Sequence, residues 1–237
     1  MVEWTRLLVK SCVLWWHAFM EGIFAIYKPT GITSHDVIHR LRLATHVQRI
    51  GHAGTLDPGA RGVLVVAIGR TYTKQLTSLI LKDKEYLVDA TFGAYSSTDD
   101  SEGEKTTIPI HSVPSRDEVF RAMQTFNGEL YLRPPIFSAI KIRGQRAYSI
   151  ARKGKTVELP KRKSIIYLIE LLDYSWPYLK FRVVTGSGVY VRSIVRALGE
   201  ILKTGAYVHG LERTRVGSFT KAHAIELDVF IRNIEEA

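Results

Sequence analysis

Cysteine is almost missing from this sequence, since Cys12 is the single one among 237 residues. A disulfide framework and a cysteine-based metal site are therefore excluded, and the chain is expected in a reducing compartment, the cytoplasm. The eight histidines lack the spacing of a metalloenzyme, and the sequence contains no glycine-rich phosphate loop. The chain is accordingly expected to work without a metal and without a cofactor.

Long hydrophobic runs are missing as well. The apolar part of the first residues runs from Cys12 to Met20, contains His17 and is too short to span a bilayer. It also lacks the small-x-small cleavage site of a secretory signal. We expect residues 1–22 to be an N-terminal extension, with Met20 as the biological start; an appended helix or a transit peptide is the alternative. No membrane partner is expected.

Negative charge is in short supply. The chain has 33 Lys and Arg against 23 Asp and Glu, which gives a net charge of +10 and a pI of about 9.7. A positive field implies a polyanionic partner, and nucleic acid is favoured over a membrane because no amphipathic basic helix stands out. The length suits one large domain, or one domain with a subdomain, and 46% hydrophobic residues can bury a sizeable core.

Hydrophobic periodicity and turn residues predict a mixture of strands and helices. Because hairpin-like strand pairs are interspersed with helices, the expected fold class is α+β around a mixed, largely antiparallel sheet, and a doubly wound sheet is disfavoured. In chain order, the expected elements are a strand at 23–27, a helix after Thr33 or Ser34, a strand at 62–68, a helix at 73–81, a strand at 85–92, a polar loop at 93–114, a helix after Ser115, strands at 165–174 and 178–185, and a helix at 191–202 that ends near Gly205.

Two of the expected helices begin with a capping signal. Thr33 or Ser34 can cap the first, and Ser115 with Glu118 forms a capping box for the second. The apolar side chains expected on one face are Val37, Ile38 and Leu41 in the first helix, and Val119, Phe120, Met123 and Phe126 in the second.

The segment from Lys141 to Lys163 is electrostatically distinct. It holds nine Lys and Arg against a single acid, Glu158, and Tyr148 lies among them. Composition alone leaves two interpretations open. The segment is either a solvated charged hairpin or helix, or a surface that follows RNA phosphates and offers an aromatic ring for base or sugar contact.

Asp57 stands in a Gly-His-x-Gly-Thr-Leu-Asp-Pro turn directly before the apolar run at 62–68. Taken alone, this aspartate is an ordinary turn residue whose side chain accepts hydrogen bonds from nearby backbone N–H groups. The surrounding pattern favours a different interpretation. The stretch GHAGTLDPGARGVLVV resembles the motif of TruB-type pseudouridine synthases in which Gly-His-x-Gly-x-Leu-Asp carries the catalytic aspartate.

Five further stretches resemble motifs of the same family in the same order, so that the resemblance covers about residues 23–226. They are KPTGITSHDV, KEYLVDATFG, PPIFSAIKIRGQRAYSIARKG, GSGVYVRSIVRALGE and LERTRVGSF. The resemblance implies the pseudouridine synthase fold, with an RNA-binding cleft across the sheet. It also implies a catalytic domain at 23–237, in which 93–163 contains RNA-contacting insertions.

The resemblance assigns roles to individual residues. Asp57 matches the catalytic aspartate, Tyr86 the base-stacking tyrosine and Arg192 the arginine that pairs with the aspartate. His52 matches the histidine that enters the RNA loop as bases flip out. Outside the resemblance, Tyr86 would be an ordinary strand aromatic, Arg192 a surface ion-pair partner and His52 a turn residue.

The remaining site residues line the expected RNA path. The resemblance implies that Leu211 forms the apolar floor under the target base and that Tyr190 and Lys141 line the cleft. The basic segment adds candidate contacts to the RNA backbone at Arg152, Lys153 and Lys155.

The chain departs from the family pattern at three places. The family's Gly-x-Ala-Thr-Lys step reads GRTYTK and is one residue longer, which puts the alignment of Lys74 in doubt. The Thr-Asp-Thr-x-Asp loop reads SSTDD, so Thr98 and Asp100 align but one aspartate is lost. The C-terminal RNA-binding (PUA) domain that many members carry is not expected in this sequence.

The resemblance implies a tRNA pseudouridine synthase that acts on uridine 55 of the T loop, as a monomer and without an obligate protein partner. Two alternatives stay open. A guide-RNA-dependent synthase of the same superfamily would usually keep the C-terminal domain, whereas AYSIARKG is similar to the stand-alone type. A non-catalytic tRNA-binding module or folding chaperone would be expected to lose Asp57 or Arg192, and the sequence has both.

Overall fold

The apolar run predicted as a strand at 62–68 forms β3 (Arg61–Ile68), which is buried along nearly its whole length. In this computed structural model the described residues are 21–138, 140–142, 145–146 and 159–236. They divide into two units, which we call unit 1 (described residues up to 82 and from 213 onward) and unit 2 (described residues of 83–212).

Unit 1 is built on a sheet in the order β14-β1-β3-β12, with β2 paired to β3. Strand β1 runs antiparallel to β3 and parallel to β14. Its elements are β1 (Gly22–Lys28), α2 (Ser34–Thr45), β2 (Ile50–His52), β3, α3 (Arg70–Thr73), α4 (Leu76–Ile80), the end of β12 (Ala206–Val216), β13 (Phe219–Thr220), a 3₁₀ turn at Lys221–His223, β14 (Ile225–Glu226) and α8 (Leu227–Glu235).

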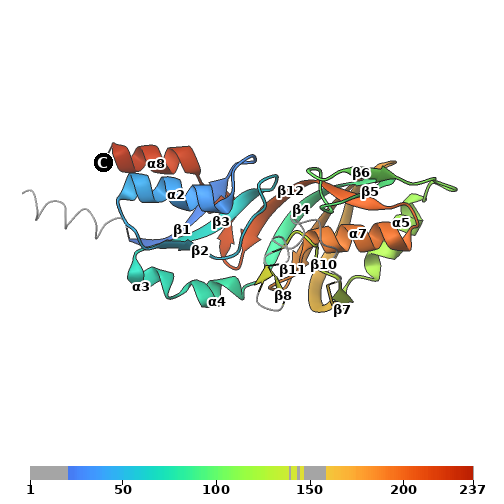
Figure 1. The fold of residues 1–237 in the computed structure, drawn as a ribbon, viewed down its shortest axis with the longest axis horizontal. Coiled ribbons are helices and arrows are strands. Elements are labelled where there is room, and N and C mark those ends of the chain that lie inside the picture. Colours follow the sequence, from blue (N-terminus) through green and yellow to red (C-terminus); the bar gives the residue numbers. More distant parts are fainter. Residues whose placement is uncertain (1–20, 139, 143–144, 147–158, 237) are drawn as a thin grey trace, which may run out of the picture. The chain divides into compact units, whose positions relative to one another are not determined.

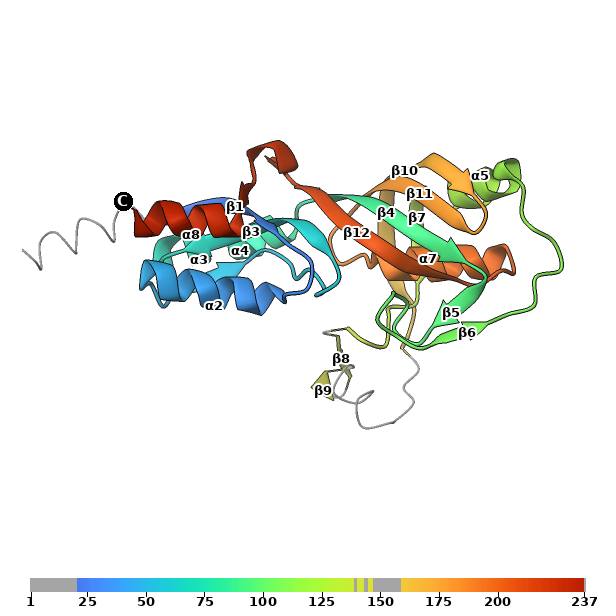
Figure 2. The ribbon, with the colours of Figure 1, turned by 90° about the horizontal axis from the view of Figure 1, so that it is seen from above.

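Both faces of the unit 1 sheet are covered. Helices α2 and α8 lie side by side on one face (Figures 1 and 2), where Leu64 and Val66 of β3 join their core. On the other face, Val63 and Val65 pack with Leu76 of α4. A strand that is buried on both faces needs apolar side chains at successive positions, which explains why β3 has no polar alternation.

Unit 2 is built on antiparallel pairs in the order β4-β11-β10-β7, with β12 next to β4. Helices α5 and α7 pack into the core on one face of this sheet. Its elements are β4 (Lys84–Phe92), β5 (Ala94–Ser96), β6 (Lys105–Thr107), α5 (Arg116–Gln124), β7 (Gly128–Leu132), β8 (Lys141–Ile142), β9 (Gln145–Arg146), β10 (Arg162–Ser175), β11 (Tyr178–Thr185), α7 (Val191–Ile201) and the beginning of β12.

The two faces of the unit 2 sheet differ in polarity. Alternate residues of β11, among them Phe181 and Val183, are buried against the helices. On the opposite face Arg182 pairs with Glu85 at 3.1 Å and with Glu170 at 2.9 Å. This alternation is the period-2 pattern that predicted β11 from sequence.

The predicted α+β class, the cap at Thr33 and the capping box at Ser115 are confirmed; the cap at Thr33 is also a capping box, with Asp36. Thr33 caps α2 together with Asp36, and Ser115 caps α5 together with Glu118. In each case the cap side chain accepts a hydrogen bond from the backbone of the third helical residue, whose carboxylate bonds back to the cap N–H.

Three local predictions were wrong. The single helix expected at 73–81 is two short helices, α3 and α4, because the chain tightens at Gln75, whose N–H donates to Tyr72 at 3.0 Å. The expected polar loop at 93–114 contains the hairpin β5–β6. Phe120 is exposed, because it is one residue, about 100°, away from the buried stripe that begins at Val119.

Two helix ends also differ from the prediction. Phe126 is buried as expected but follows the last residue of α5. Helix α7 ends with Leu202 as its C-cap and not at Gly205, because Lys203 already takes a left-handed conformation, φ 56°. Gly205 then turns the chain at φ 61° into β12. Among the described residues, no helix is long and apolar enough to cross a membrane.

Candidate active site

Asp57 lies in the turn between β2 and β3, in unit 1. The turn begins where the N–H of Ala53 donates to Val65 at 2.8 Å and closes where the N–H of Ala60 donates to the carbonyl of Asp57 at 3.1 Å. Leu56, next to the aspartate, is buried, whereas Asp57 itself is half-buried. The turn is therefore fixed by the core on one side and presents its carboxylate near the surface.

Ser34, the first residue of α2, holds the turn from the helix side. Its hydroxyl donates to the carbonyl oxygen of Leu56 and accepts from the N–H of Leu56, both at 2.9 Å. The hydroxyl thereby satisfies both backbone groups of the residue preceding Asp57 in a buried setting, where an unpaired donor or acceptor would cost about 1–3 kcal/mol.

Lys28 holds the other end of the turn. Its side chain is fully buried, and its ammonium donates to the carbonyls of Pro29 at 2.8 Å, Ile32 at 2.7 Å and Pro58 at 3.3 Å. A buried ammonium is tolerated only when its three N–H donors find acceptors. One of these acceptors is the carbonyl of Pro58, the residue that follows Asp57, so the ammonium of Lys28 fixes the position of the turn that carries Asp57.

Arg213, at the unit 1 end of β12, completes the support. It is 1% exposed, and its guanidinium donates to Val63 at 2.8 Å and to Gly54 at 3.0 Å. Gly62 at φ 110° lets the backbones of β3 and β12 approach closely, because a Cβ there would lie 2.2 Å from the carbonyl oxygen of Arg213. The first residues of β3 and the beginning of the turn are thus fixed to the same arginine.

His52 ends β2, five residues before Asp57. Its Nδ1 is buried and has no hydrogen-bond partner within the part of the chain that the structure describes. Burial lowers the pKa of His52 from 6.5 to about 4, and the charges of Arg213 and His35 add to this effect. The imidazole is therefore neutral at physiological pH.

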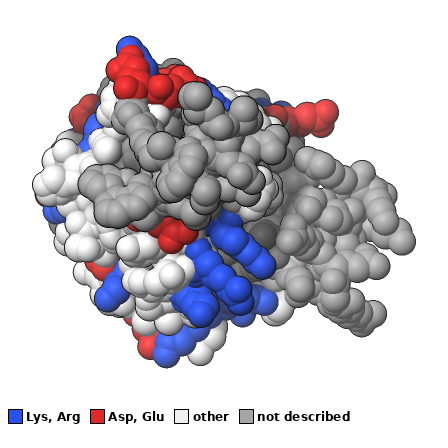
Figure 3. Space-filling model, turned by 90° about the vertical axis from the view of Figure 1, so that its left-hand side faces the viewer, with Lys and Arg blue, Asp and Glu red and all other residues white. Residues whose placement is uncertain are grey.

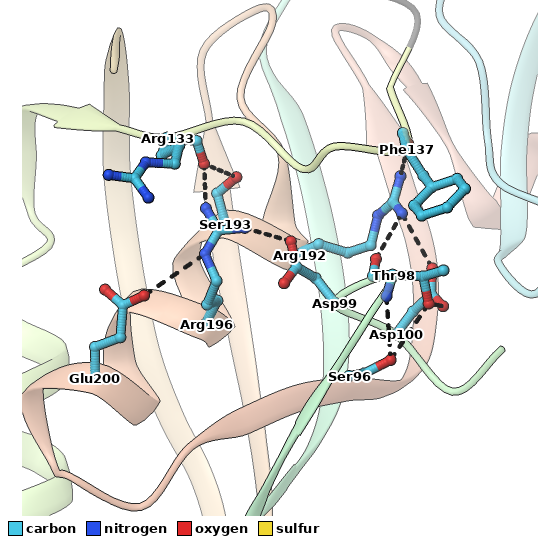
Figure 4. A network of polar contacts seen from close by, with 10 residues as sticks. All are labelled: Ser96, Thr98, Asp99, Asp100, Arg133, Phe137, Arg192, Ser193, Arg196 and Glu200. Atoms are coloured by element: carbon cyan, nitrogen blue, oxygen red, sulfur yellow. Dashed lines mark hydrogen bonds and ion pairs between the residues drawn. The ribbon is translucent and has the colours of Figure 1, made fainter. Parts of the chain in front are cut away.

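Arg192, the second residue of α7, is the centre of a polar network in unit 2 (Figure 4). Its Nη1 donates to the carbonyl of Thr98 at 2.9 Å and pairs with Asp100 at 3.1 Å, and its Nη2 donates to the carbonyl of Phe137 at 3.0 Å. Only 7% of its side chain is exposed. These contacts fix the plane of the buried guanidinium. Because the helix dipole disfavours a cation near the N-terminus of α7, the buried charge of Arg192 needs an anionic partner.

The other predicted residues of unit 2 lie on β4, α7 and β12. Tyr86 is buried on the core face of β4, and Leu211 of β12 packs against the same core cluster. Tyr190 is the N-cap residue of α7, two positions before Arg192, and its carbonyl accepts from Ser193 at 3.0 Å. Unit 2 therefore carries Tyr86, Tyr190, Arg192 and Leu211, while unit 1 carries His52 and Asp57. The predicted pair between Asp57 and Arg192 stays a prediction.

The basic segment is described only in part. Lys141 belongs to the short strand β8, whose backbone pairs with β9. Arg152, Lys153, Lys155 and Tyr148 lie outside the described residues. Their predicted contacts with RNA phosphates therefore stay predictions.

Four residues at these positions were missed from sequence. Lys28 and Ser34 lie in the quoted opening motif and Arg213 in the closing one, yet none received a role in the site; Ser34 was expected only as a candidate helix cap. Asp99 of the SSTDD loop was also given no role, although it lies next to Asp100 in the network around Arg192. The sequence did contain one sign of such a role, namely a lysine or arginine near the end of an apolar strand. A cation at such a position is expected to be buried and must therefore find hydrogen-bond acceptors.

Comparison with known proteins now adds to the geometry. Residues 42–191 match the family described as TruB family pseudouridylate synthase (N terminal domain), a range that includes His52, Asp57, Tyr86, Lys141 and Tyr190. The chain is 44% identical over 211 residues to tRNA pseudouridine synthase B of Clostridium novyi, covering 88% of this chain and 72% of that protein. It is 42% identical over 200 residues to tRNA pseudouridine synthase B of Protochlamydia amoebophila, covering 84% and 76%.

Solved structures give the same assignment. The chain resembles a chain of a Cbf5–Nop10–Gar1 complex with a TM-score of 0.71 and 28% identity, covering 93% of this chain. It resembles a chain of an H/ACA RNP bound to a substrate RNA containing 2′-deoxyuridine with a TM-score of 0.67 and 26% identity, covering 89%. It spans 56% and 52% of those chains, just over half of their length. Fold and sequence thus define a pseudouridine synthase. The chain belongs to the TruB family of pseudouridylate synthases.

Proposed function

We propose that the protein isomerises uridine 55 in the T loop of tRNA to pseudouridine, with Asp57 as the catalytic carboxylate. The observation that carries the proposal is the rigid turn around Asp57, whose neighbours on both sides are bonded to Ser34 and Lys28. A catalytic group must be held within a fraction of an ångström of its productive position, which flexible loops do not achieve. The relatives named tRNA pseudouridine synthase B support the choice of tRNA as substrate.

The chemistry suits these residues. The reaction breaks an N–C glycosidic bond and forms a C–C bond between the same two rings, so it is redox-neutral. It needs a nucleophile or base close to ribose C1′ and uracil C6, and the carboxylate of Asp57 can serve as either. In a dry site an aspartate would tend to be protonated, so we propose that Arg192 keeps it ionised through a bidentate pair.

The target base has to leave the folded T loop before it can react. Flipping costs about a few kcal/mol. We propose that Tyr86 stacks on the flipped base and that His52 fills the vacated space, at about 1–3 kcal/mol per stacked base. The neutral state of His52 suits this role, because an uncharged imidazole enters a stack of bases with a smaller loss of hydration.

The charge distribution supports an RNA partner. Between residues 37 and 82, Asp57 is the only acid, against seven Lys and Arg. Figure 3 shows Lys and Arg side chains gathered in one region of the face that it draws. Such a field attracts the phosphate backbone of an RNA.

We further propose that residues 23–237 act as the catalytic domain, in the cytoplasm, as a monomer and without an obligate protein partner. Leu211, Tyr190 and Lys141 would line the path of the target base. The single cysteine supports a reducing compartment. The insertions within 93–163 would supply the contacts with the RNA backbone.

A guide-RNA-dependent synthase is the second candidate, favoured by the likeness to the chain of an H/ACA RNP. The higher identity, 44% against 26%, is with a tRNA pseudouridine synthase B. The two are separated by incubating the purified protein with unmodified tRNA that carries tritium at uracil C5, in the absence of any guide RNA. Release of tritium from the wild-type transcript, but not from one with cytidine at position 55, supports the proposed function. Release that requires an added guide supports the second candidate, and no release under either condition refutes both.

A further inference from the structure

Two arginines one turn apart on α7 face two consecutive aspartates. Arg192 pairs with Asp100 at 3.1 Å, and Arg196 pairs with Asp99 (Figure 4). Side chains at i and i+4 of a helix are close neighbours on its surface. The charge of Arg192 also acts on Asp99. We call the observed arrangement, Arg192 with Asp100 and Arg196 with Asp99, the pairing register.

Asp99 cannot easily move out of this position. It is only 9% exposed, its N–H donates to Ser96 at 3.0 Å, and its carbonyl accepts from Val208 at 3.0 Å. Its backbone takes the left-handed region at φ 63°, which aspartate and asparagine tolerate better than most residues. The backbone of Asp99 is thus fixed beside the two arginines.

The electrostatics of Asp99 involve both arginines. Burial raises the pKa of Asp99, and the charges of Arg196 and then Arg192 act in the opposite direction. The carboxylate therefore depends on a cation, and Arg196 is the one that its Oδ2 contacts directly. If Arg196 were removed, Arg192 would be the remaining arginine whose positive charge stabilises the ionised carboxylate of Asp99.

Arg196 is itself held from a second side. Its Nη2 donates to the carbonyl of Arg133, which also accepts from the hydroxyl of Ser193 at 2.8 Å. Its Nε lies 3.8 Å from the exposed carboxylate of Glu200. Arg196 thus joins the 96–100 loop to the segment that leads from Arg133 to Phe137, the same two segments that bond to Arg192.

We propose that Arg196 is a positioning residue for the reaction: by binding Asp99 it keeps this carboxylate off Arg192, so that Arg192 retains Thr98, Asp100 and Phe137 as partners. The proposal rests on the proposed function, in which Arg192 must present its guanidinium to Asp57. A second carboxylate bound to Arg192 would rotate the guanidinium out of the plane defined by its contacts with Thr98, Asp100 and Phe137. It would also neutralise part of the positive charge that, in the proposed function, keeps Asp57 ionised.

The test is a suppressor experiment. Arg196→Gln is expected to lower kcat by about tenfold to a hundredfold, because a misplaced group costs that much, while KM for tRNA changes by less than about twofold. Adding Asp99→Asn removes the competing carboxylate and keeps the shape and the left-handed backbone. The double variant is therefore expected to return to the kcat of Asp99→Asn alone. A purely structural role predicts that the double variant is as slow as Arg196→Gln, or slower, and that result overturns the proposal.

Arg182→Gln is the matched control. Arg182 also bonds to two acids, Glu85 and Glu170, but on the helix-free face of the same sheet. Arg182→Gln is expected to leave kcat unchanged. Thermal unfolding of all four variants shows whether each is folded at the assay temperature.

A crystal structure of Arg196→Gln separates this proposal from the proposed function. The expected result is the Asp99 carboxylate in contact with the Arg192 guanidinium, which is independent of turnover. Suppose that the wild-type protein makes no pseudouridine, but that Asp99 contacts Arg192 in the structure of Arg196→Gln. The proposed function is then wrong, whereas the conclusion that Arg196 sets the pairing register holds. If Arg192 keeps Asp100 as its partner and Asp99 stays away from it, Arg196 does not set the register and the inference is wrong.

Discussion

The ammonium of Lys28 lies 3.3 Å from the carbonyl oxygen of Pro58, thirty residues later in the chain, and the residue before that proline is Asp57. The other two donors of Lys28 go to Pro29 and Ile32, next to the lysine itself. The contact with Pro58 therefore joins the end of β1 to the turn that carries the proposed catalytic carboxylate. Through these three hydrogen bonds to neutral carbonyl groups, the buried cation fixes the position of the turn.

Replacing Lys28 by methionine should loosen this turn. The thioether keeps most of the volume but donates no hydrogen bond, so the partly buried carbonyls of Pro29 and Ile32 lose this donor, while Pro58 keeps the N–H of Gly31. We expect the free energy of unfolding to fall by about 1–3 kcal/mol, and kcat to fall by about tenfold or more because the turn shifts. Urea unfolding and tritium release measure the two effects.

The matched control is Lys180→Met, which removes an exposed lysine paired with Asp89 at 3.3 Å. It should change the free energy of unfolding by less than about 0.5 kcal/mol. If Lys28→Met is as active and as stable as this control, the turn does not depend on the buried ammonium.

Gly62→Ala should destabilise unit 1 strongly. The new Cβ would lie 2.2 Å from the carbonyl oxygen of Arg213, a backbone atom that cannot move aside cheaply, and φ at this position is 110°. We expect a loss of more than about 2 kcal/mol in the free energy of unfolding. Gly31→Ala is the control, because φ there is 86° but no atom lies within 4 Å. It carries the backbone strain alone, about 1–2 kcal/mol. Equal losses at the two glycines would show that the contact with Arg213 plays no part.

Local rules predicted much of the fold, because they act over a few residues. The run at 62–68 has the length and composition of a buried strand, and Ser115 is followed three residues later by the carboxylate of a capping box. The hairpin β5–β6 was missed because local rules had nothing to act on there. Its strands are three residues long and largely polar, so that neither periodicity nor hydrophobicity marks them.

The site was predictable to a smaller extent. The setting of Asp57 in a turn before a core strand is visible in the sequence, and the roles of the other residues came from the family resemblance. The support of the turn was not visible, because Ser34 and Arg213 bond to backbone atoms 22 to 159 residues away. Hydrogen bonds to main-chain carbonyls place no restriction on the type of the accepting residue, so they leave no pattern to find.

His52 should make the stability of the protein depend on pH. The unfolded chain binds a proton at this histidine below a pKa of 6.5, whereas the folded protein binds it only near 4. The unfolded state therefore holds more protons between these values, and stability is lost as the pH falls from 6.5 towards 4. At pH 5 the titration of His52 should lower the free energy of unfolding by about 2 kcal/mol relative to neutral pH.

Chemical denaturation at pH 7.5 and pH 5.0 tests this, with His52→Gln as the comparison. Gln keeps the polar size but does not titrate, so the variant should lose about 2 kcal/mol less than the wild type over this range. Other groups contribute equally to both proteins and cancel in the difference. An identical loss in the two proteins would mean that His52 titrates normally in the folded state.

Asp57→Asn should abolish pseudouridine formation. The substitution keeps the shape of the side chain and the turn, but an amide is neither the nucleophile nor the base that the reaction needs. The affinity for tRNA should stay within about threefold of the wild type, because the phosphate contacts are unchanged. Tritium release and a filter-binding titration measure the two quantities. Appreciable turnover by the purified variant would remove Asp57 from its proposed role.

Binding of tRNA should depend steeply on salt, and the segment from Lys141 to Lys163 should supply much of this dependence. Each phosphate contact that is removed lowers the slope of log K against log salt by roughly 0.7–0.9. Changing Arg152, Lys153 and Lys155 together to Gln should therefore weaken binding and flatten the slope by about 2 if all three touch phosphate.

Turnover at saturating tRNA should stay nearly unchanged in this triple variant, because contacts with phosphates position the RNA and do not touch the reacting base. The control is a second triple variant that removes the same charge elsewhere, at the exposed Lys180, Lys203 and Arg232. It tests whether net charge alone sets the slope. If the two triple variants flatten the slope equally, the loss reflects the general field of the protein. An unchanged slope in the first would mean that the basic run is a solvated face, and the path of the RNA must then follow another surface.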